Sequence, residues 1–172
     1  MSGHVIISHG LNSSPDSSKA VAIAQACALL GWSYELPDYQ DLDSRMAPMG
    51  DVEARIARLR TLAEAVQGPL VLAGSSMGAF ISAQVSLQVP VLGLYLMAPP
   101  IQLQGYDMDL RTPDVPVSVV HGWHDELIPA DAVCQWAGQQ HATLCMVDDS
   151  HRLSRHVDFC AQQFALFLGT LA

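Results

Sequence analysis

A serine stands between two glycines in the segment Gly-Ser-Ser-Met-Gly at positions 74–78, after the apolar run 70–73 and before the alanine-rich segment 79–87. A strand, a Gly-x-Ser-x-Gly turn and a helix in this order form the sharp bend that exposes a nucleophilic serine at the carboxyl end of a sheet. The glycines are needed because larger side chains would collide with the neighbouring strand and helix. The pattern predicts that Ser76 presents its hydroxyl above the sheet, although so short a pattern also occurs by chance.

A nucleophilic serine needs a base, and the base needs an orienting acid. The candidate acid is Asp125, which follows the apolar run 117–120 and precedes Pro129, where a helix is expected to begin. The alternative is an ordinary helix-capping or solvated turn aspartate. The adjacent Glu126 is expected to point elsewhere.

The candidate base is His151, which follows the apolar run 143–147. It is the histidine that comes after the acid in the chain and lies on a loop that follows a strand, as the Ser-acid-His order requires. We expect its Nδ1 proton to go to Asp125, which leaves Nε2 free to deprotonate Ser76.

Backbone amides are the expected donors to an oxyanion that forms at this serine. One is the amide of Met77, directly after the nucleophile, and the other is the amide of Leu11, in the loop 9–15 after the first strand. Gly10 lets this loop turn sharply. His9 is interpreted as a structural residue that holds the loop through its ring nitrogens.

The elements that must position these residues are short apolar strands that alternate with helical patterns. The expected strands are 4–8, 33–36, 70–73, 91–97, 117–120 and 143–147. Continuous apolar runs are typical of parallel strands covered on both faces. The alternation predicts a doubly wound, mostly parallel sheet of about six strands in a three-layer α/β/α sandwich. Each candidate residue follows a strand, so all should gather at one sheet edge.

Two helices can be read in some detail. Ser14-Pro15 resembles an N-cap with proline at the first helical position, and Gly31 supplies the C-terminal stop. The inward face of this first helix is expected at Ala20, Ile23, Ala24, Cys27 and Leu30. Asp51 is the expected cap of the next helix, whose apolar face is Val52, Ile56, Leu59, Ala63 and Val66. Arg55, Arg58 and Glu64 are expected on its solvated face.

Composition limits the class of protein. The chain has 172 residues and a net charge of −9, so one domain over 1–172 with a sizeable core is expected. Without a cluster of lysine and arginine, nucleic acid and membrane surfaces are unexpected partners. The protein is expected to be a monomer by default, and a weak homodimer formed by pairing of an exposed edge strand is the alternative.

The scattered cysteines at 27, 134, 145 and 160 are interpreted as reduced thiols, although an even count also allows two disulfides. Without a signal-peptide pattern, a cytoplasmic location is expected.

The motif set His9-Gly10, Gly74-x-Ser76-x-Gly78, His121-Gly122-x-x-Asp125 and His151 resembles that of the α/β-hydrolases, almost from end to end of the chain. Its opening segment, 9–15, is similar to that of small bacterial esterases of the YqiA-like kind. The resemblance implies hydrolysis of carboxylic esters or thioesters by Ser76, Asp125 and His151, with no metal or organic cofactor. The segment 98–116 is too short for a lid domain, and the first two strands of larger members are absent, so we expect an open, minimal site.

Five residues that flank the motif loops are candidates for a small-molecule pocket: Leu11, Met77, Ile101, Trp123 and Leu153. Their alternative is ordinary core packing or shielding of the site. The competing function is an inactive binding or scaffold protein on the same fold. A cysteine nucleophile is disfavoured because no cysteine occupies the strand-to-helix turn.

Overall fold

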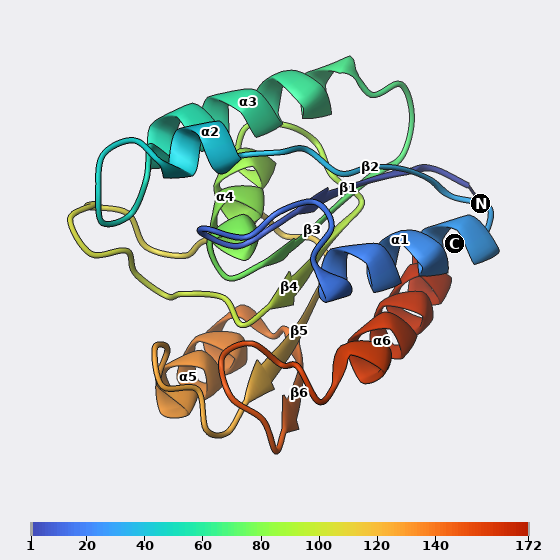
Figure 1. Cartoon of the computed structure of the whole chain (residues 1–172). Coiled ribbons are helices and arrows are strands. Elements are labelled where there is room, and N and C mark those ends of the chain that lie inside the picture. The colour runs from blue at the N-terminus through green and yellow to red at the C-terminus, as the bar shows by residue number, and fades with distance from the viewer. Residues whose placement is uncertain (1, 172) are drawn as a thin grey trace.

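The computed structural model describes residues 2–171, over which it contains six strands and six helices (Figure 1). The strands are β1 His4–Ser8, β2 Ser33–Glu35, β3 Leu70–Ser75, β4 Gly93–Met97, β5 Val117–Gly122 and β6 Thr143–Val147. The helices are α1 Ser18–Leu29, α2 Gln40–Asp43, α3 Val52–Ala65, α4 Met77–Ser86, α5 Ala130–Gln140 and α6 Val157–Thr170.

The six strands form a single sheet in the order β2-β1-β3-β4-β5-β6, and every pairing is parallel. This confirms the expected doubly wound sheet. The register aligns the carboxyl ends of the inner strands, since Ser8 pairs with Gly74 and Ser75 pairs with Met97. The loops that leave these ends therefore meet at one edge of the sheet.

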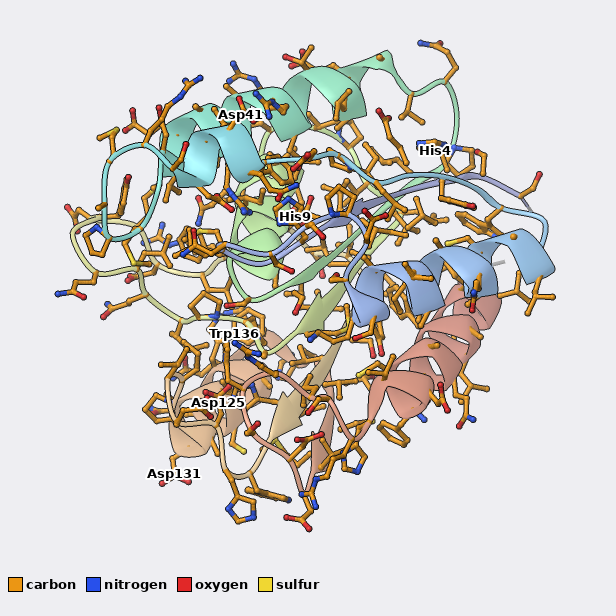
Figure 2. All side chains as sticks on the ribbon, viewed as in Figure 1. His4, His9, Asp41, Asp125, Asp131 and Trp136 are labelled. Atoms are coloured by element: carbon orange, nitrogen blue, oxygen red, sulfur yellow. The ribbon has the colours of Figure 1, made fainter. Side chains whose placement is uncertain are left out.

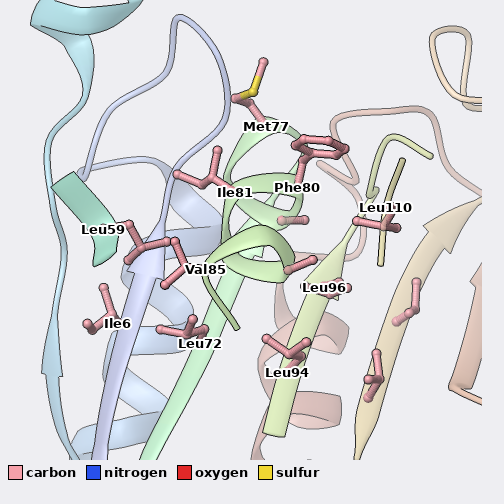
Figure 3. Packing of buried hydrophobic residues seen from close by; sticks show 14 of the residues in the cluster. Ile6, Leu59, Leu72, Met77, Phe80, Ile81, Val85, Leu94, Leu96 and Leu110 are labelled. Carbon is pink, nitrogen blue, oxygen red and sulfur yellow. The ribbon is translucent and has the colours of Figure 1, made fainter. Parts of the chain in front are cut away.

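Helices cover both faces of the sheet (Figure 1). One face packs against α3, α4 and α5 through a cluster that includes Leu59, Phe80 and Leu96 (Figure 3). The other face packs against α1 and α6 through a cluster that includes Ile23 and Phe164. Each large apolar side chain removed from water contributes about 1.5–3 kcal/mol, so these two clusters stabilise the platform that carries the loops.

The first helix begins later than the sequence predicts. Ser14 accepts a hydrogen bond from the Asp16 amide at its Oγ and one from the Ser17 amide at its carbonyl, so it caps a turn, and Ser17 is the N-cap of α1. Leu30, expected to face inward, is 47% exposed. Gly31 ends the helix at φ +73°, as expected. The short helix α2 was not predicted.

The cap of α3 is confirmed, since the Asp51 side chain accepts the amide of Ala54 at 3.0 Å. The expected solvated face is wrong at Arg55, which is fully buried. Arg55 lies three residues after Val52 and four before Leu59, on the inward face of the helix. Burial is possible because the Asp43 carboxylate on α2 and two backbone carbonyls accept hydrogen bonds from its guanidinium.

The connection from β4 to β5, residues 98–116, contains no helix and only an isolated bridge between Gln102 and Asp109. The expected absence of a lid between these strands is therefore confirmed. Over residues 2–171, no helix combines the length and the apolar character needed to cross a membrane.

Candidate active site

Ser76 lies at the sharp turn between β3 and α4, with φ +53° and ψ −117°. A non-glycine residue at positive φ is strained and persists only where its surroundings fix it. The Ser76 amide donates to the carbonyl of Met97 at 2.8 Å, and its carbonyl accepts from Phe80 at 3.1 Å. A Cβ at Gly78 would collide with the carbonyl oxygen of Ser8, and one at Gly74 with the backbone of Gly78. Gly74 therefore lets β3 approach the start of α4, and Gly78 lets α4 pack directly against the end of β1.

The structure brings Ser76, His151 and Asp125 into one hydrogen-bonded chain. The Ser76 Oγ lies 2.9 Å from His151 Nε2, and His151 Nδ1 lies 2.7 Å from Asp125 Oδ2. The three residues come from the turn after β3, the loop after β6 and the loop after β5, and Figure 2 labels Asp125 in the last of these. A proton on Nδ1, donated to the carboxylate, leaves Nε2 able to accept the serine proton.

The Asp125 carboxylate is completely buried, and both of its oxygens have hydrogen-bond partners. Its Oδ1 accepts the amides of Leu127 at 2.9 Å and Ile128 at 2.7 Å, while Oδ2 faces His151. Burial acts to raise the pKa of this carboxyl, but the hydrogen bonds from His151 and the two amides outweigh it, so the pKa is lowered. Asp125 is thus held as an anion beside the imidazole.

The loops that carry Asp125 and His151 are joined by backbone contacts. The Trp123 amide donates to the carbonyl of Val147, and the His124 amide donates to that of Asp149. A Cβ at Gly122 would collide with the carbonyl of Asp149, so the glycine permits this close approach.

Two acidic residues, Glu126 and Asp149, hold the His151 loop in place, and neither role was predicted from the sequence. Glu126, expected to point elsewhere, accepts the backbone amide of His151 at 3.1 Å. Asp149 is buried and accepts the amides of Ser150 and Arg155 and the Nδ1 of His156, at 2.8–3.0 Å. Burial opposes ionisation of Asp149, yet these donors lower its pKa. No local sequence pattern indicates these contacts, because the donors and acceptors come close together only when the loop is folded.

The loop after β1 lies beside Ser76, as expected of the second oxyanion donor. A Cβ at Gly10 would lie 3.4 Å from the Ser75 carbonyl and 3.6 Å from the Ser76 Cβ. Among residues 2–171, the amides of Leu11 and Met77 have no hydrogen-bond acceptor within the protein. His9 holds the loop through both ring nitrogens, with Nδ1 2.7 Å from the Gly10 carbonyl and Nε2 accepting the Tyr39 amide at 2.9 Å. Its predicted structural role is confirmed.

The five pocket candidates do not all lie together, although Leu11, Met77 and Ile101 belong to or pack against one cluster. Met77 and Leu153 are buried in the two clusters on opposite faces of the sheet, so the core alternative describes them. Trp123 is 52% exposed, whereas Leu11 and Ile101 are partly buried against the core. A cavity of about 320 Å³ is formed instead by segments 46–53 and 104–106, and its lining includes Met46, Met49 and Tyr106. Neither this cavity nor a second of about 310 Å³ is lined by Ser76.

The cysteines are all free, so the alternative of two disulfides is excluded. Cys27 and Cys160 are buried, and burial raises their thiol pKa values to about 12 and about 11. Within residues 2–171 no group of three or more histidine, cysteine or acidic side chains is arranged to hold a metal ion.

A family model described as an alpha/beta hydrolase domain matches residues 2–159 of the chain. The chain belongs to the alpha/beta hydrolase family. No curated protein matches its sequence.

Solved structures agree with this assignment. A protein of Xanthomonas campestris pv. campestris assigned to the alpha/beta hydrolase superfamily shares 48% identity with this hydrolase, covers 98% of it and 99% of its own chain, and has a TM-score of 0.96. An alpha/beta serine hydrolase without a lid, from Xanthomonas campestris, shares 21% identity over 96% of this chain and 81% of its own, with a TM-score of 0.72. Est1E from Butyrivibrio proteoclasticus, solved with ferulic acid, shares 16% identity over 98% and 88%, with a TM-score of 0.74. The last two likenesses concern the fold alone.

Proposed function

We propose that this hydrolase cleaves small carboxylic esters or thioesters through an acyl-enzyme on Ser76, with Asp125 and His151 as the other members of a catalytic triad. The observation that carries the proposal is the hydrogen-bonded chain from Ser76 Oγ through the His151 ring to the buried Asp125 carboxylate.

In the first half of the reaction, His151 Nε2 takes the proton of Ser76 as Oγ attacks the substrate carbonyl carbon. The carbonyl oxygen becomes an oxyanion, which accepts hydrogen bonds from the Leu11 and Met77 amides. When the tetrahedral intermediate collapses, His151 gives the proton to the departing alcohol or thiol. Asp125 stays ionised and stabilises the imidazolium that exists between the two transfers.

In the second half, a water molecule gives its proton to His151 and attacks the acyl carbon. Collapse of this intermediate breaks the bond to Oγ, returns the proton to Ser76 and releases the carboxylic acid. Each proton taken by His151 is given back within the same half-reaction.

The open setting of Ser76 supports small substrates. No lid lies between β4 and β5, and the two cavities of about 310–320 Å³ are lined by residues other than the triad. Long acyl chains would therefore remain exposed to water and contribute little binding energy. The substrate is proposed to be a small molecule that a monomeric protein binds without metal or organic cofactor.

The proposal is tested by hydrolysis of p-nitrophenyl esters and acetyl thioesters of increasing acyl length. Acetate and butyrate are expected to be turned over faster than palmitate, and Ser76→Ala is expected to lower kcat by at least about a thousandfold. Ser75→Ala, one residue earlier, is the matched control and should keep its activity. Equal turnover by Ser76→Ala and wild type would refute the proposal, and a folded but inert wild type would favour the binding-protein alternative.

A further inference from the structure

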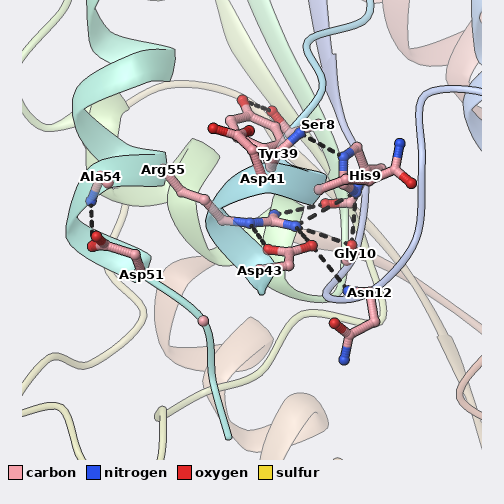
Figure 4. Close-up of polar contacts among 12 residues, drawn as sticks. Ser8, His9, Gly10, Asn12, Tyr39, Asp41, Asp43, Asp51, Ala54 and Arg55 are labelled. Atoms are coloured by element: carbon pink, nitrogen blue, oxygen red, sulfur yellow. Dashed lines mark hydrogen bonds and ion pairs between the residues drawn. The ribbon is translucent and has the colours of Figure 1, made fainter. Parts of the chain in front are cut away.

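Arg55 is the largest side chain that the fold buries completely. Burying a guanidinium is costly unless hydrogen bonds and an opposite charge compensate. Its Nε and Nη2 each lie 2.7 Å from one oxygen of the buried Asp43 carboxylate, and its face lies 4.5 Å from the centre of the Tyr39 ring (Figure 4). The pair joins α3 to α2, beside the loop that follows β1.

The remaining donors of Arg55 reach two backbone carbonyls of that loop. Nη1 donates to the His9 carbonyl at 2.9 Å, and Nη2 donates to the Gly10 carbonyl at 3.1 Å. The Gly10 carbonyl also accepts from His9 Nδ1 at 2.7 Å and from the Ser13 amide at 3.2 Å. Asp43 completes the arrangement, because its Oδ2 accepts the Asn12 amide at 2.9 Å. The loop is thus held at consecutive peptide units.

The Gly10 carbonyl and the Leu11 amide belong to the same peptide unit. In a trans peptide the C=O and the following N–H point in opposite directions, so fixing one fixes the other. Three donors hold the carbonyl on the Arg55 side, while Gly10 itself lies against Ser75 and Ser76 on the other. The Leu11 amide, which has no acceptor among residues 2–171, is directed away from Arg55.

We propose that Arg55, held by Asp43, is a positioning residue that fixes the Gly10–Leu11 peptide unit so that the Leu11 amide is ready to bind the oxyanion. This inference rests on the proposed function. Lysine cannot take this role, because an ammonium lacks the planar fork that reaches one carboxylate and two carbonyls at once. A mobile Leu11 amide would stabilise the transition state poorly while leaving the Ser76–His151 contact intact.

The test compares Arg55→Lys and Asp43→Asn with wild type and with Arg58→Lys. Arg58 is the matched control, since it sits on the same helix and pairs with Asp41 at 2.7 and 2.9 Å on the exposed side. Each variant is assayed for kcat and KM on p-nitrophenyl acetate, for affinity toward phenylboronic acid, and for its thermal unfolding temperature. Boronic acids form a tetrahedral adduct on the serine oxygen and therefore report on the oxyanion site.

For Arg55→Lys and Asp43→Asn we expect kcat to fall about 10- to 100-fold and boronate affinity to weaken in parallel, with KM little changed. The midpoint of the acidic limb of the pH–rate profile should stay in place, because the His151 base is untouched. Arg58→Lys should match wild type. When guanidinium is added to the Arg55→Ala variant at concentrations too low to denature the protein, it should fill the space left by the side chain and restore part of the lost kcat.

If wild-type protein is active and folded Arg55→Lys or Asp43→Asn protein has the same kcat and boronate affinity, this inference is overturned while the proposed function stands. Wild-type protein without ester turnover would overturn the proposed function and this inference with it. Should Arg55→Lys fail to fold, Asp43→Asn decides, because it keeps the volume of the side chain and removes only its charge.

Discussion

At the scale of single residues, two buried histidines couple stability to pH. His9 is held as a neutral ring, since its Nε2 accepts the Tyr39 amide. Among residues 2–171, the fully buried His121 has no hydrogen-bond partner at Nδ1, and its Nε2 lies 3.1 Å from the Ile128 carbonyl. Burial lowers the pKa of both residues, and in His9 the Arg55 charge adds to this effect. A carboxylate lies 3.5 Å from each Nε2, that of Asp38 beside His9 and that of Asp125 beside His121, but its attraction does not outweigh the cost of burying a charged ring.

The unfolded chain takes up protons at these two positions as the pH falls through about 6.5, while the folded protein resists until lower pH. The free energy of unfolding should therefore fall below about pH 6.5, by up to about 1.4 kcal/mol per pH unit for each histidine. Urea denaturation at several pH values between neutrality and pH 5 measures this slope. His121→Gln, whose amide nitrogen can replace Nε2, should have a shallower slope. A flat wild-type profile over this range would contradict the interpretation.

The sequence predicted the triad candidates because each follows a strand at the edge where ligands bind. It did not predict the burial of Arg55, since residue type suggested a solvated position. The signal was present in the spacing from Val52 to Arg55 to Leu59, which places the arginine on the buried face. What the sequence lacked was the partner, because Asp43 lies on a short helix that carries no clear pattern.

At the scale of elements, the turn between β3 and α4 depends on its contact with β1. A methyl group at Gly78 would collide with backbone atoms of Ser8 and His9, which belong to β1 and its loop and cannot move independently. Gly78→Ala is expected to cost about 1–3 kcal/mol of stability and to displace Ser76 from His151. Thermal or urea unfolding, together with ester hydrolysis, measures both effects.

Gly138→Ala is the matched control for this prediction. Gly138 lies in α5 with no atom near the added methyl group, so the same substitution should stabilise the protein by about 0.4–1 kcal/mol. If the Gly78→Ala variant is as stable and as active as the wild-type protein, the turn can move away from β1 and the prediction is wrong.

The expected strands match the observed ones to within about two residues, because apolar runs bounded by turns are strong local signals. Helix starts were less predictable. The Ser14-Pro15 pattern marks a turn, and α1 begins at Ser18, since the same residue types favour turns and caps. The length of β2, only three exposed residues at the sheet edge, could not be read from its sequence.

At the scale of the whole molecule, the sheet serves as a platform for four connections, which leave the carboxyl ends of β1, β3, β5 and β6. The order β2-β1-β3-β4-β5-β6 places β3 between β1 and β4, so the Ser76 turn lies beside the loop that carries Leu11. The strands β5 and β6 are neighbours, which brings the Asp125 and His151 loops together. Every loop needed for the proposed chemistry directly follows a strand of this one sheet.

Ser76 is proposed to be an activated nucleophile, and labelling with a fluorophosphonate probe at mildly alkaline pH measures this property. Intact mass and peptide mapping should find one adduct per chain, on Ser76, and none in Ser76→Ala protein that unfolds at a similar temperature. If folded wild-type protein takes up no probe, or if the Ser76→Ala protein takes up as much probe as wild type, Ser76 is not an activated nucleophile.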